Sequence, residues 1–244
     1  MANIVGKTYC INTVIPILQD LLRDDNSEVR LNVASNMHRL AQQVGSEMLS
    51  GNLLSILTPM TKDTQWRVRM AVFELIGKLS IAFGKDIFMR SLSDIFMTYL
   101  TNTAASVRGM GVTMVGQLAS NFGPDWVTDH LIPKVVESYN VEQQGYNYRM
   151  CALETLSAVM PVLRKETITE KVLPILVKAC TDRIPNVQFC VARIIQANYR
   201  LIDESEFNAT LAPKLRDMAH ESDKDVAYFA YTAIQAYQNR AEAK

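Results

Sequence analysis

Residues 65–75 read QWRVRMAVFEL, and related segments recur along the whole chain. They are SEVRLNVASNM at 27–37, ASVRGMGVTMV at 105–115, YNYRMCALETL at 146–156, PNVQFCVARII at 185–195 and KDVAYFAYTAI at 224–234. The central valine, or the tyrosine that replaces it in one segment, returns every 39 residues, with a single step of 41. A fixed period of this size without a β pattern is typical of a solenoid built from helical hairpins.

Four further residue types keep the same register around this anchor valine. An Asp or another polar residue stands five positions before it, as Asp24, Asp63, Asn102, Gln143, Asp182 and Glu221. An arginine follows it in four segments, as Arg30, Arg69, Arg108 and Arg149, and prolines and glycines precede it as Pro16, Pro133, Pro174, Pro213, Gly6, Gly45, Gly84 and Gly123. Chance would rarely align four residue types on one period, so the repeat reflects structure.

Each register position has an expected physical role. The glycine should adopt a left-handed conformation where the second helix of a repeat ends. The proline should kink the first helix, and the Asp or Asn in the turn should cap the second. We expect the arginine to bond an Asp of its own or the next repeat. The resulting ladder should be incomplete at Gln188 and Ala227, which replace the arginine.

The pattern predicts an all-α fold, a solenoid with about six antiparallel helix pairs wound into a right-handed superhelix. We expect a single array over 1–244 with repeats at 7–44, 45–83, 84–122, 123–163, 164–202 and 203–241. Gly6 stands where the other glycines close a second helix. Residues 1–6 therefore look like the stub of a preceding repeat, and we expect the chain to be a piece of a longer array.

Composition limits the classes of function. The 25 basic and 25 acidic residues give no net charge, so no general field favours nucleic acid or membrane binding. The 48 % of apolar residues can build a continuous core, while no apolar run approaches the ~20 residues of a membrane span. The four cysteines form no CxxC pair, which predicts buried thiols in a reducing compartment.

The sequence offers no catalytic, metal or cofactor site. His38, His130 and His220 lie far apart, and none has a second ligand at metal-binding spacing. Gly109 and Gly111 follow no strand and form no dinucleotide fingerprint, so we interpret them as small residues that permit close helix packing. No phosphate-binding loop and no nucleophile elbow occurs. We therefore predict a non-enzymatic chain without cofactors.

One variable position instead suggests a binding surface. Two residues before the anchor stand Ser27, Trp66, Ala105, Tyr146, Pro185 and Lys224. A tryptophan at the tip of a turn, followed by Arg67, belongs to the residue types enriched in binding hot spots. Tyr146, with Tyr148 and Arg149, repeats the aromatic-plus-arginine theme. Alternatively, Trp66 folds down onto a neighbouring turn and serves packing.

The repeats resemble HEAT repeats, with a proline in the first helix and Asp followed by Val-Arg at the turn. The stretches SEVRLN, QWRVRMA, FGPDWVTDHLIPKV and KDVAYFA resemble the C-terminal repeats of the scaffold (A, regulatory) subunit of protein phosphatase 2A, and the similarity spans essentially the whole chain. This resemblance implies a scaffold whose turns bind the phosphatase catalytic subunit. It also implies that regulatory B-type subunits bind mainly through repeats outside this sequence, and that neither nucleic acid nor membrane is a partner.

The resemblance assigns binding roles to particular turn residues. Those carried over are Trp66, Arg67, Tyr148, Arg149, Ile184 and Asn186, with Tyr146 added by the aromatic theme and Ala104 standing where the family has a valine. Tyr148 stands where the family usually has a histidine. The expected location is the cytoplasm, and the nucleus as well. A helical-repeat transport receptor or coat adaptor is the alternative, although the zero net charge does not support an acidic cargo surface.

Overall fold

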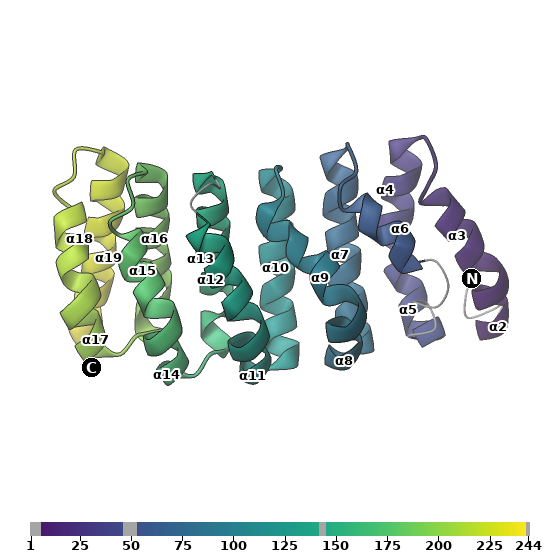
Figure 1. Ribbon diagram of the computed structural model, residues 1–244. Helices are drawn as coiled ribbons and strands as arrows, with labels where there is room; N and C mark the ends of the chain where they lie inside the picture. The colour runs from purple at the N-terminus through teal and green to yellow at the C-terminus, as the bar shows by residue number, and fades with distance from the viewer. Residues whose placement is uncertain (1–5, 46–52, 142–144, 243–244) are drawn as a thin grey trace. The chain divides into compact units, whose positions relative to one another are not determined.

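The computed structural model describes residues 6–45, 53–141 and 145–242 (Figure 1). Within these ranges the chain forms helices joined by short turns and contains no strand, which confirms the all-α prediction. The chain divides into two compact units, Met1–Phe122 and Gly123–Lys244, and the dividing point coincides with the predicted boundary between the third and fourth repeats. The predicted stub at 1–6 lies almost wholly outside the described residues.

The first unit contains three helix pairs. The first pair is α2 (Lys7–Tyr9), η1 (Cys10–Val14) and α3 (Ile15–Leu21), followed by α4 (Ser27–Asn36) and α5 (His38–Val44). The second is α6 (Leu53–Met60) and α7 (Trp66–Phe83). The third is α8 (Lys85–Ile87), η3 (Phe88–Leu92), α9 (Ser93–Met97) and η4 (Thr98–Thr101), followed by α10 (Ala105–Phe122). Helix α7 packs between α4 and α10.

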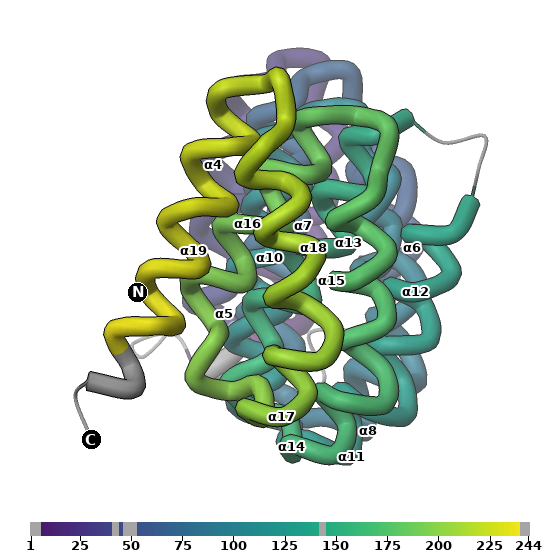
Figure 2. The backbone as a smooth tube through the Cα atoms, turned by 90° about the vertical axis from the view of Figure 1, so that its left-hand side faces the viewer, coloured from purple at the N-terminus to yellow at the C-terminus, as the bar shows by residue number. Residues whose placement is uncertain are grey.

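The second unit repeats this plan. Its first helices are α11 (Pro124–Trp126), η5 (Val127–Leu131) and α12 (Ile132–Asn140); α14 (Lys165–Thr167), η7 (Ile168–Val172) and α15 (Leu173–Ala179); and α17 (Glu204–Glu206), η9 (Phe207–Leu211) and α18 (Ala212–Met218). Its second helices are α13 (Tyr146–Val159) with η6 (Met160–Val162), α16 (Pro185–Asn198) with η8 (Tyr199–Leu201), and α19 (Lys224–Glu242). Helix α16 packs between α13 and α19, and each first helix lies against the second helix of its repeat (Figure 2).

A π-helical turn interrupts the first helix at the same register in five repeats. It comprises η1, η3, η5, η7 and η9, and a proline follows at the start of α3, α12, α15 and α18. The third repeat forms the same turn with Ser93 and Asp94 in place of a proline. The proline therefore follows a wider helical turn that tolerates its missing N–H, and does not interrupt a regular α-helix as we expected.

The four register glycines have positive φ, but Gly6, Gly84 and Gly123 are not left-handed helical. Gly84 has φ 87° and ψ 171°, and Gly6 and Gly123 are similar, whereas a left-handed helical residue has ψ near +47°. For these three glycines the expectation was right about φ and wrong about ψ. The observed region is essentially restricted to glycine, because a Cβ atom would clash with the backbone. Gly84 is both the residue that follows the last turn of α7 and the residue that precedes the first turn of α8.

Four of the six anchor residues belong to the buried core, whereas Val29 and Tyr148 are half-buried. Val68 and Val107 in the first unit and Val187 and Val226 in the second are at most 1 % exposed. Gly111 lies against the fully buried ring of Tyr99, which agrees with the packing role predicted for this glycine. The four cysteines, Cys10, Cys151, Cys180 and Cys190, are buried and free, as the sequence predicted.

Candidate partner-binding edge

The turns that join the two helices of a repeat lie at the same end of the helices within each unit (Figure 1). We call these turns the turn edge of that unit. The first unit contributes the turns at 22–26, 61–65 and 102–104, and the second contributes those at 180–184 and 219–223. The turn before α13 includes residues 142–144, and Gln143 therefore lies outside the described residues.

The register Asp or Asn folds the turn onto itself. In four turns its Oδ1 accepts a hydrogen bond from the N–H two residues later: Asp24 from Asn26 (2.8 Å), Asp63 from Gln65 (2.8 Å), Asn102 from Ala104 (3.1 Å) and Asp182 from Ile184 (2.9 Å). These side chains therefore stabilise the turn and do not cap the helix itself, a role that Asn26 performs for α4.

The last turn departs from the register. Asp223, and not Glu221, accepts hydrogen bonds from the N–H groups of Asp225 and Val226, at 3.0 and 3.1 Å. The expectation for Glu221 was wrong because Asp223 directly precedes α19, where a short carboxylate reaches the first free N–H groups.

Three of the register arginines, Arg30, Arg69 and Arg149, connect successive turns, as predicted. Arg30 donates from Nε to Asp63 Oδ2 (2.8 Å) and from Nη2 to Asp63 Oδ1 (3.1 Å). Arg149 pairs with Asp182 in the same two-pronged way, at 2.8 and 3.0 Å. Arg69 reaches the next turn through Nε alone, which donates to Asn102 Oδ1 at 3.3 Å. The arginine side chains of the two carboxylate pairs are about 15 % exposed, which makes these pairs structural parts of the edge.

Arg30, Arg69 and Arg108 also fix the turn of their own repeat. Nη1 of Arg30 donates to the carbonyl oxygens of Asp24 (2.7 Å) and Asp25 (3.0 Å), and Arg69 and Arg108 make equivalent bonds. Gln188 retains one bond of this kind, from Nε2 to the carbonyl of Asp182 at 2.9 Å. The replacement at Gln188 therefore keeps the contact within the turn.

The predicted binding residues of the first unit stand at the tips of the turns. Trp66 begins α7 and is 40 % exposed, and the Arg67 guanidinium lies 5.5 Å from the centre of its ring. Arg67 is itself exposed, and Ala104 is half-buried. An aromatic ring with a stacked guanidinium on a hydrogen-bonded turn offers a preformed contact surface.

The predicted binding residues of the second unit are less uniform. Asn186 is exposed, whereas Tyr146, Tyr148 and Ile184 are half-buried. Arg149 forms an ion pair with Asp182, and its side chain is only 15 % exposed. It therefore stabilises the turn edge and does not present a free charge to a partner. Whether these residues bind a partner stays a prediction.

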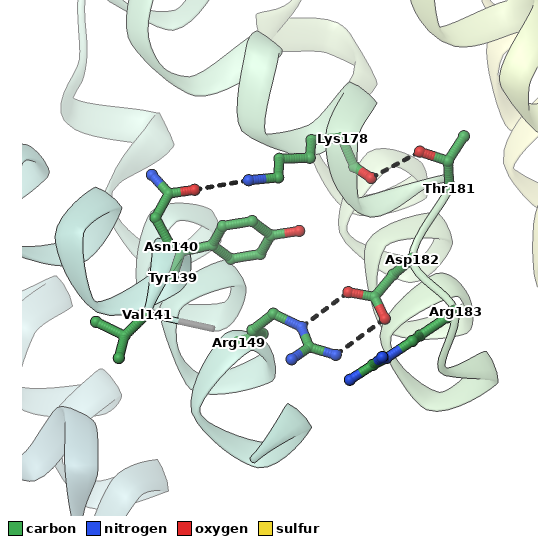
Figure 3. Close-up of a pocket in the computed structure, with 8 residues that line it drawn as sticks. All are labelled: Tyr139, Asn140, Val141, Arg149, Lys178, Thr181, Asp182 and Arg183. Carbon is green, nitrogen blue, oxygen red and sulfur yellow. Dashed lines mark hydrogen bonds and ion pairs between the residues drawn. The ribbon is translucent and has the colours of Figure 1, made fainter. Parts of the chain in front are cut away.

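Grooves that the sequence did not predict lie between neighbouring turns. One, of about 630 Å³, lies beside the Arg149–Asp182 pair and is lined by Tyr139, Lys178 and Arg183, among others (Figure 3). Lys178 donates to Asn140 Oδ1 at 2.8 Å, and its ammonium lies 5.6 Å from the centre of the Tyr139 ring. Burial, reinforced by Asp182, raises the pKa of Tyr139 to about 12, so this phenol keeps its proton.

Grooves also lie beside turns in the described part of the first unit. One, of about 230 Å³, lies beside Arg30 and Asp63 and includes apolar residues such as Ile56 and Met60. The other, of about 490 Å³, is lined by Thr61, Lys62, Arg69, Thr98, Thr101, Asn102 and Thr103. Lys62, Lys178 and Arg183 stand outside the register positions, which is why the repeat pattern gave no signal for them.

An exposed aromatic group also lies away from the turn tips. Tyr228 and Tyr231 on α19 are 62 % and 55 % exposed. Between them, Phe229 stacks on Phe189, with 5.8 Å between the two ring centroids. The part of the chain that the structure describes contains no cluster of three metal-binding side chains. None of its helices combines the length and apolarity that crossing a bilayer would require.

Comparison with known proteins agrees with this architecture. A HEAT repeat family model matches residues 14–44 and 53–83. The chain is 32 % identical over 120 residues to the A-type regulatory subunit of protein phosphatase PP2A from Saccharomyces cerevisiae, a match that covers 47 % of this chain and 19 % of that protein. It is 33 % identical over 69 residues to the protein of the same name from Schizosaccharomyces pombe, covering 28 % and 11 %. The matches thus span about one fifth or less of the relatives' length.

Solved structures share the fold at low sequence identity. Importin beta superposes with a TM-score of 0.68 at 13 % identity, covering 94 % of this chain and 30 % of that one. Cex1p superposes with a TM-score of 0.66 at 14 % identity, covering 95 % and 45 %. The chain is therefore an all-α helical-repeat protein that matches the HEAT repeat model at residues 14–44 and 53–83 and is similar, over about half of its length, to the A-type regulatory subunit of PP2A in yeasts.

Proposed function

We propose that the chain is a non-catalytic scaffold whose turn edge binds the catalytic subunit of a 2A-type serine/threonine phosphatase. It would position that subunit relative to regulatory subunits held mainly by further repeats, in the cytoplasm and the nucleus. The homology to the A-type regulatory subunit of PP2A supports this proposal. The observation that carries it is Trp66, an exposed indole with Arg67 stacked beside it at the tip of a turn.

The turn that presents Trp66 is held on both sides. Asp63 accepts from the N–H of Gln65 within the turn, and Arg30 of the preceding repeat pairs with the same carboxylate. Arg69 donates to the carbonyls of Asp63 (2.6 Å) and Thr64 (3.3 Å). Because these bonds exist before any partner arrives, binding loses little conformational entropy at the backbone. A rigid edge suits a protein that positions other proteins.

The likeness to importin beta and Cex1p does not favour the alternative of a transport receptor. At 13 % and 14 % identity it establishes only the shared helical-repeat fold. Exposed aromatic and arginine side chains at the turn tips favour recognition of a folded protein surface by the edge.

The test is binding of the purified catalytic subunit to the chain and to Trp66→Ala, measured by biolayer interferometry. A central aromatic hot spot typically contributes about 2–4 kcal/mol, so the variant should bind roughly 30- to 1000-fold more weakly. Its melting temperature should stay within a few degrees, since Trp66 is a tip residue. Tyr231→Ala is the matched control, because it removes an exposed aromatic ring from α19 and should leave affinity unchanged.

Two results would contradict the proposal. One is equal loss of affinity in Trp66→Ala and Tyr231→Ala. The other is unfolding of Trp66→Ala with unchanged affinity per folded molecule, which would show that Trp66 serves packing.

A further inference from the structure

Asn102 differs chemically from its equivalents in the ladder between turns. Asp63 and Asp182 each provide two carboxylate oxygens, which accept from both Nε and Nη2 of the arginine of the preceding repeat. Asn102 has one oxygen, and its other terminal atom is an NH2 group that donates. The substitution removes both a negative charge and an acceptor from the groove of the second and third repeats.

The hydrogen bonds of Asn102 fix which way its amide points. Its Oδ1 accepts from the N–H of Ala104 at 3.1 Å and from Arg69 Nε at 3.3 Å. The amide nitrogen therefore cannot exchange places with the oxygen without losing both bonds. Within the described residues, Arg69 Nη2 and Asn102 Nδ2 have no acceptor. Two donor groups thus lie beside one groove, at a position where the turns of Asp63 and Asp182 have a closed pair.

The rest of this groove adds donors and no negative charge. Lys62 is exposed and forms no ion pair with any described residue. The hydroxyl of Thr103 likewise has no partner among them. No Asp or Glu lines the groove, whereas the grooves beside Arg30 and Arg149 contain Asp63 and Asp182. A cavity of about 490 Å³ with cationic and neutral donors has the chemistry of an anion site.

We propose that the groove formed by Lys62, Arg69, Asn102 and Thr103 binds an oxyanion, namely the carboxylate or phosphate group of an acidic side chain on a protein partner. The anion takes the acceptor role that the second carboxylate oxygen fills at Asp63 and Asp182. It receives charge-assisted hydrogen bonds from Arg69 Nη2 and Lys62, and neutral ones from Asn102 Nδ2 and Thr103. This site goes beyond the proposed function and does not require the phosphatase partner.

The first experiment titrates inorganic phosphate into the whole chain at constant ionic strength, with chloride as the balancing anion. Two-dimensional NMR should show saturable shifts at the amides of Thr103 and Ala104. Asn102→Asp supplies the missing carboxylate, closes the pair with Arg69 and should weaken phosphate binding at least tenfold. Lys62→Ala should weaken it severalfold without touching the ladder, so it tests the site even where the first variant folds differently.

Asn32→Asp is the control for added charge. This exposed residue on α4 undergoes the same chemical change outside the groove, so phosphate affinity should stay within about twofold. Peptides that differ only in one central residue then distinguish the ligands. Tighter binding of a glutamate peptide than of its glutamine counterpart identifies a carboxylate, and preference for phosphoserine identifies a phosphate. Absence of saturable shifts, or equal phosphate binding by the parent and Asn102→Asp, would overturn the proposal.

Discussion

Replacing Arg30 with methionine should cost the chain about 2–4 kcal/mol of stability. The change removes two bonds to Asp63 and two to the carbonyls of its own turn, at 2.7–3.1 Å. It leaves the Asp63 side chain, 9 % exposed, with a single backbone donor. Removing one partner of a buried ion pair typically costs 3–5 kcal/mol of stability. We expect a slightly smaller cost here because this pair lies at the edge of the fold. Methionine keeps the apolar stem, so the loss reports mainly on polar contacts.

Arg23→Met is the matched control. Arg23 pairs with Asp20 at 4.0 Å, and the two side chains are 53 % and 83 % exposed. Such a pair contributes about 0–1 kcal/mol, so this variant should unfold almost as the parent does. Both variants remove one arginine from the same turn region and change net charge equally.

The assay is urea unfolding followed by circular dichroism, supported by hydrogen exchange at α4 and α7. Exchange is needed because a repeat array need not unfold in one step. Arg30→Met should lower protection most in the turns at 22–26 and 61–65. Equal destabilisation by the two variants, or a cost for Arg30→Met below about 0.5 kcal/mol, would refute the view that the ladder stabilises the edge.

Two further predictions concern the core. Gly111→Ala should destabilise the chain by about 1–3 kcal/mol, because the new Cβ would overlap the buried ring of Tyr99. Gly109→Ala, which meets no atom within 4 Å on the same helix, should instead stabilise it by about 0.5–1 kcal/mol, and thermal melts that order the two variants the other way would contradict this packing. Burial raises the pKa of Cys180 and Cys190 from 9.0 to about 12, so iodoacetamide should label both thiols far faster in the unfolded chain than in the native one. Because the unfolded thiols lose their protons first, stability should also decline as pH rises from about 9 to 12, and a rise over that range in a chain that retains both thiols would contradict the assignment.

The repeat period predicted the helix pairs and the ladder because these features depend on contacts within one repeat or between neighbouring repeats. A residue in register meets the same surroundings in each repeat, so its chemistry can be inferred from the pattern alone. Arg30 and Arg149 fulfil this expectation with the same two-pronged bond to the next turn.

Other features could not be read from the pattern. The π turn has no side-chain signature, since the third repeat forms it with Ser93 and Asp94 where other repeats have a proline. The grooves depend on where residues outside the register, such as Lys178 and Arg183, lie relative to the next repeat. The exposure of Trp66 agrees with the predicted tip position, but exposure alone does not identify a partner.

Asn102 shows why one register position can carry two kinds of information. As a turn former, asparagine equals aspartate, because each needs only one oxygen to accept the N–H two residues later. As a ladder partner, it lacks the second oxygen and the charge that Asp63 and Asp182 supply to an arginine. A sequence pattern that treats asparagine and aspartate as equivalent predicts the turn correctly. It gives no sign of the donors that are left without an acceptor, Arg69 Nη2 and Asn102 Nδ2, among the described residues. The described turns therefore share their internal hydrogen bonding while their grooves differ in charge, and the anion site proposed beside Asn102 depends on that difference.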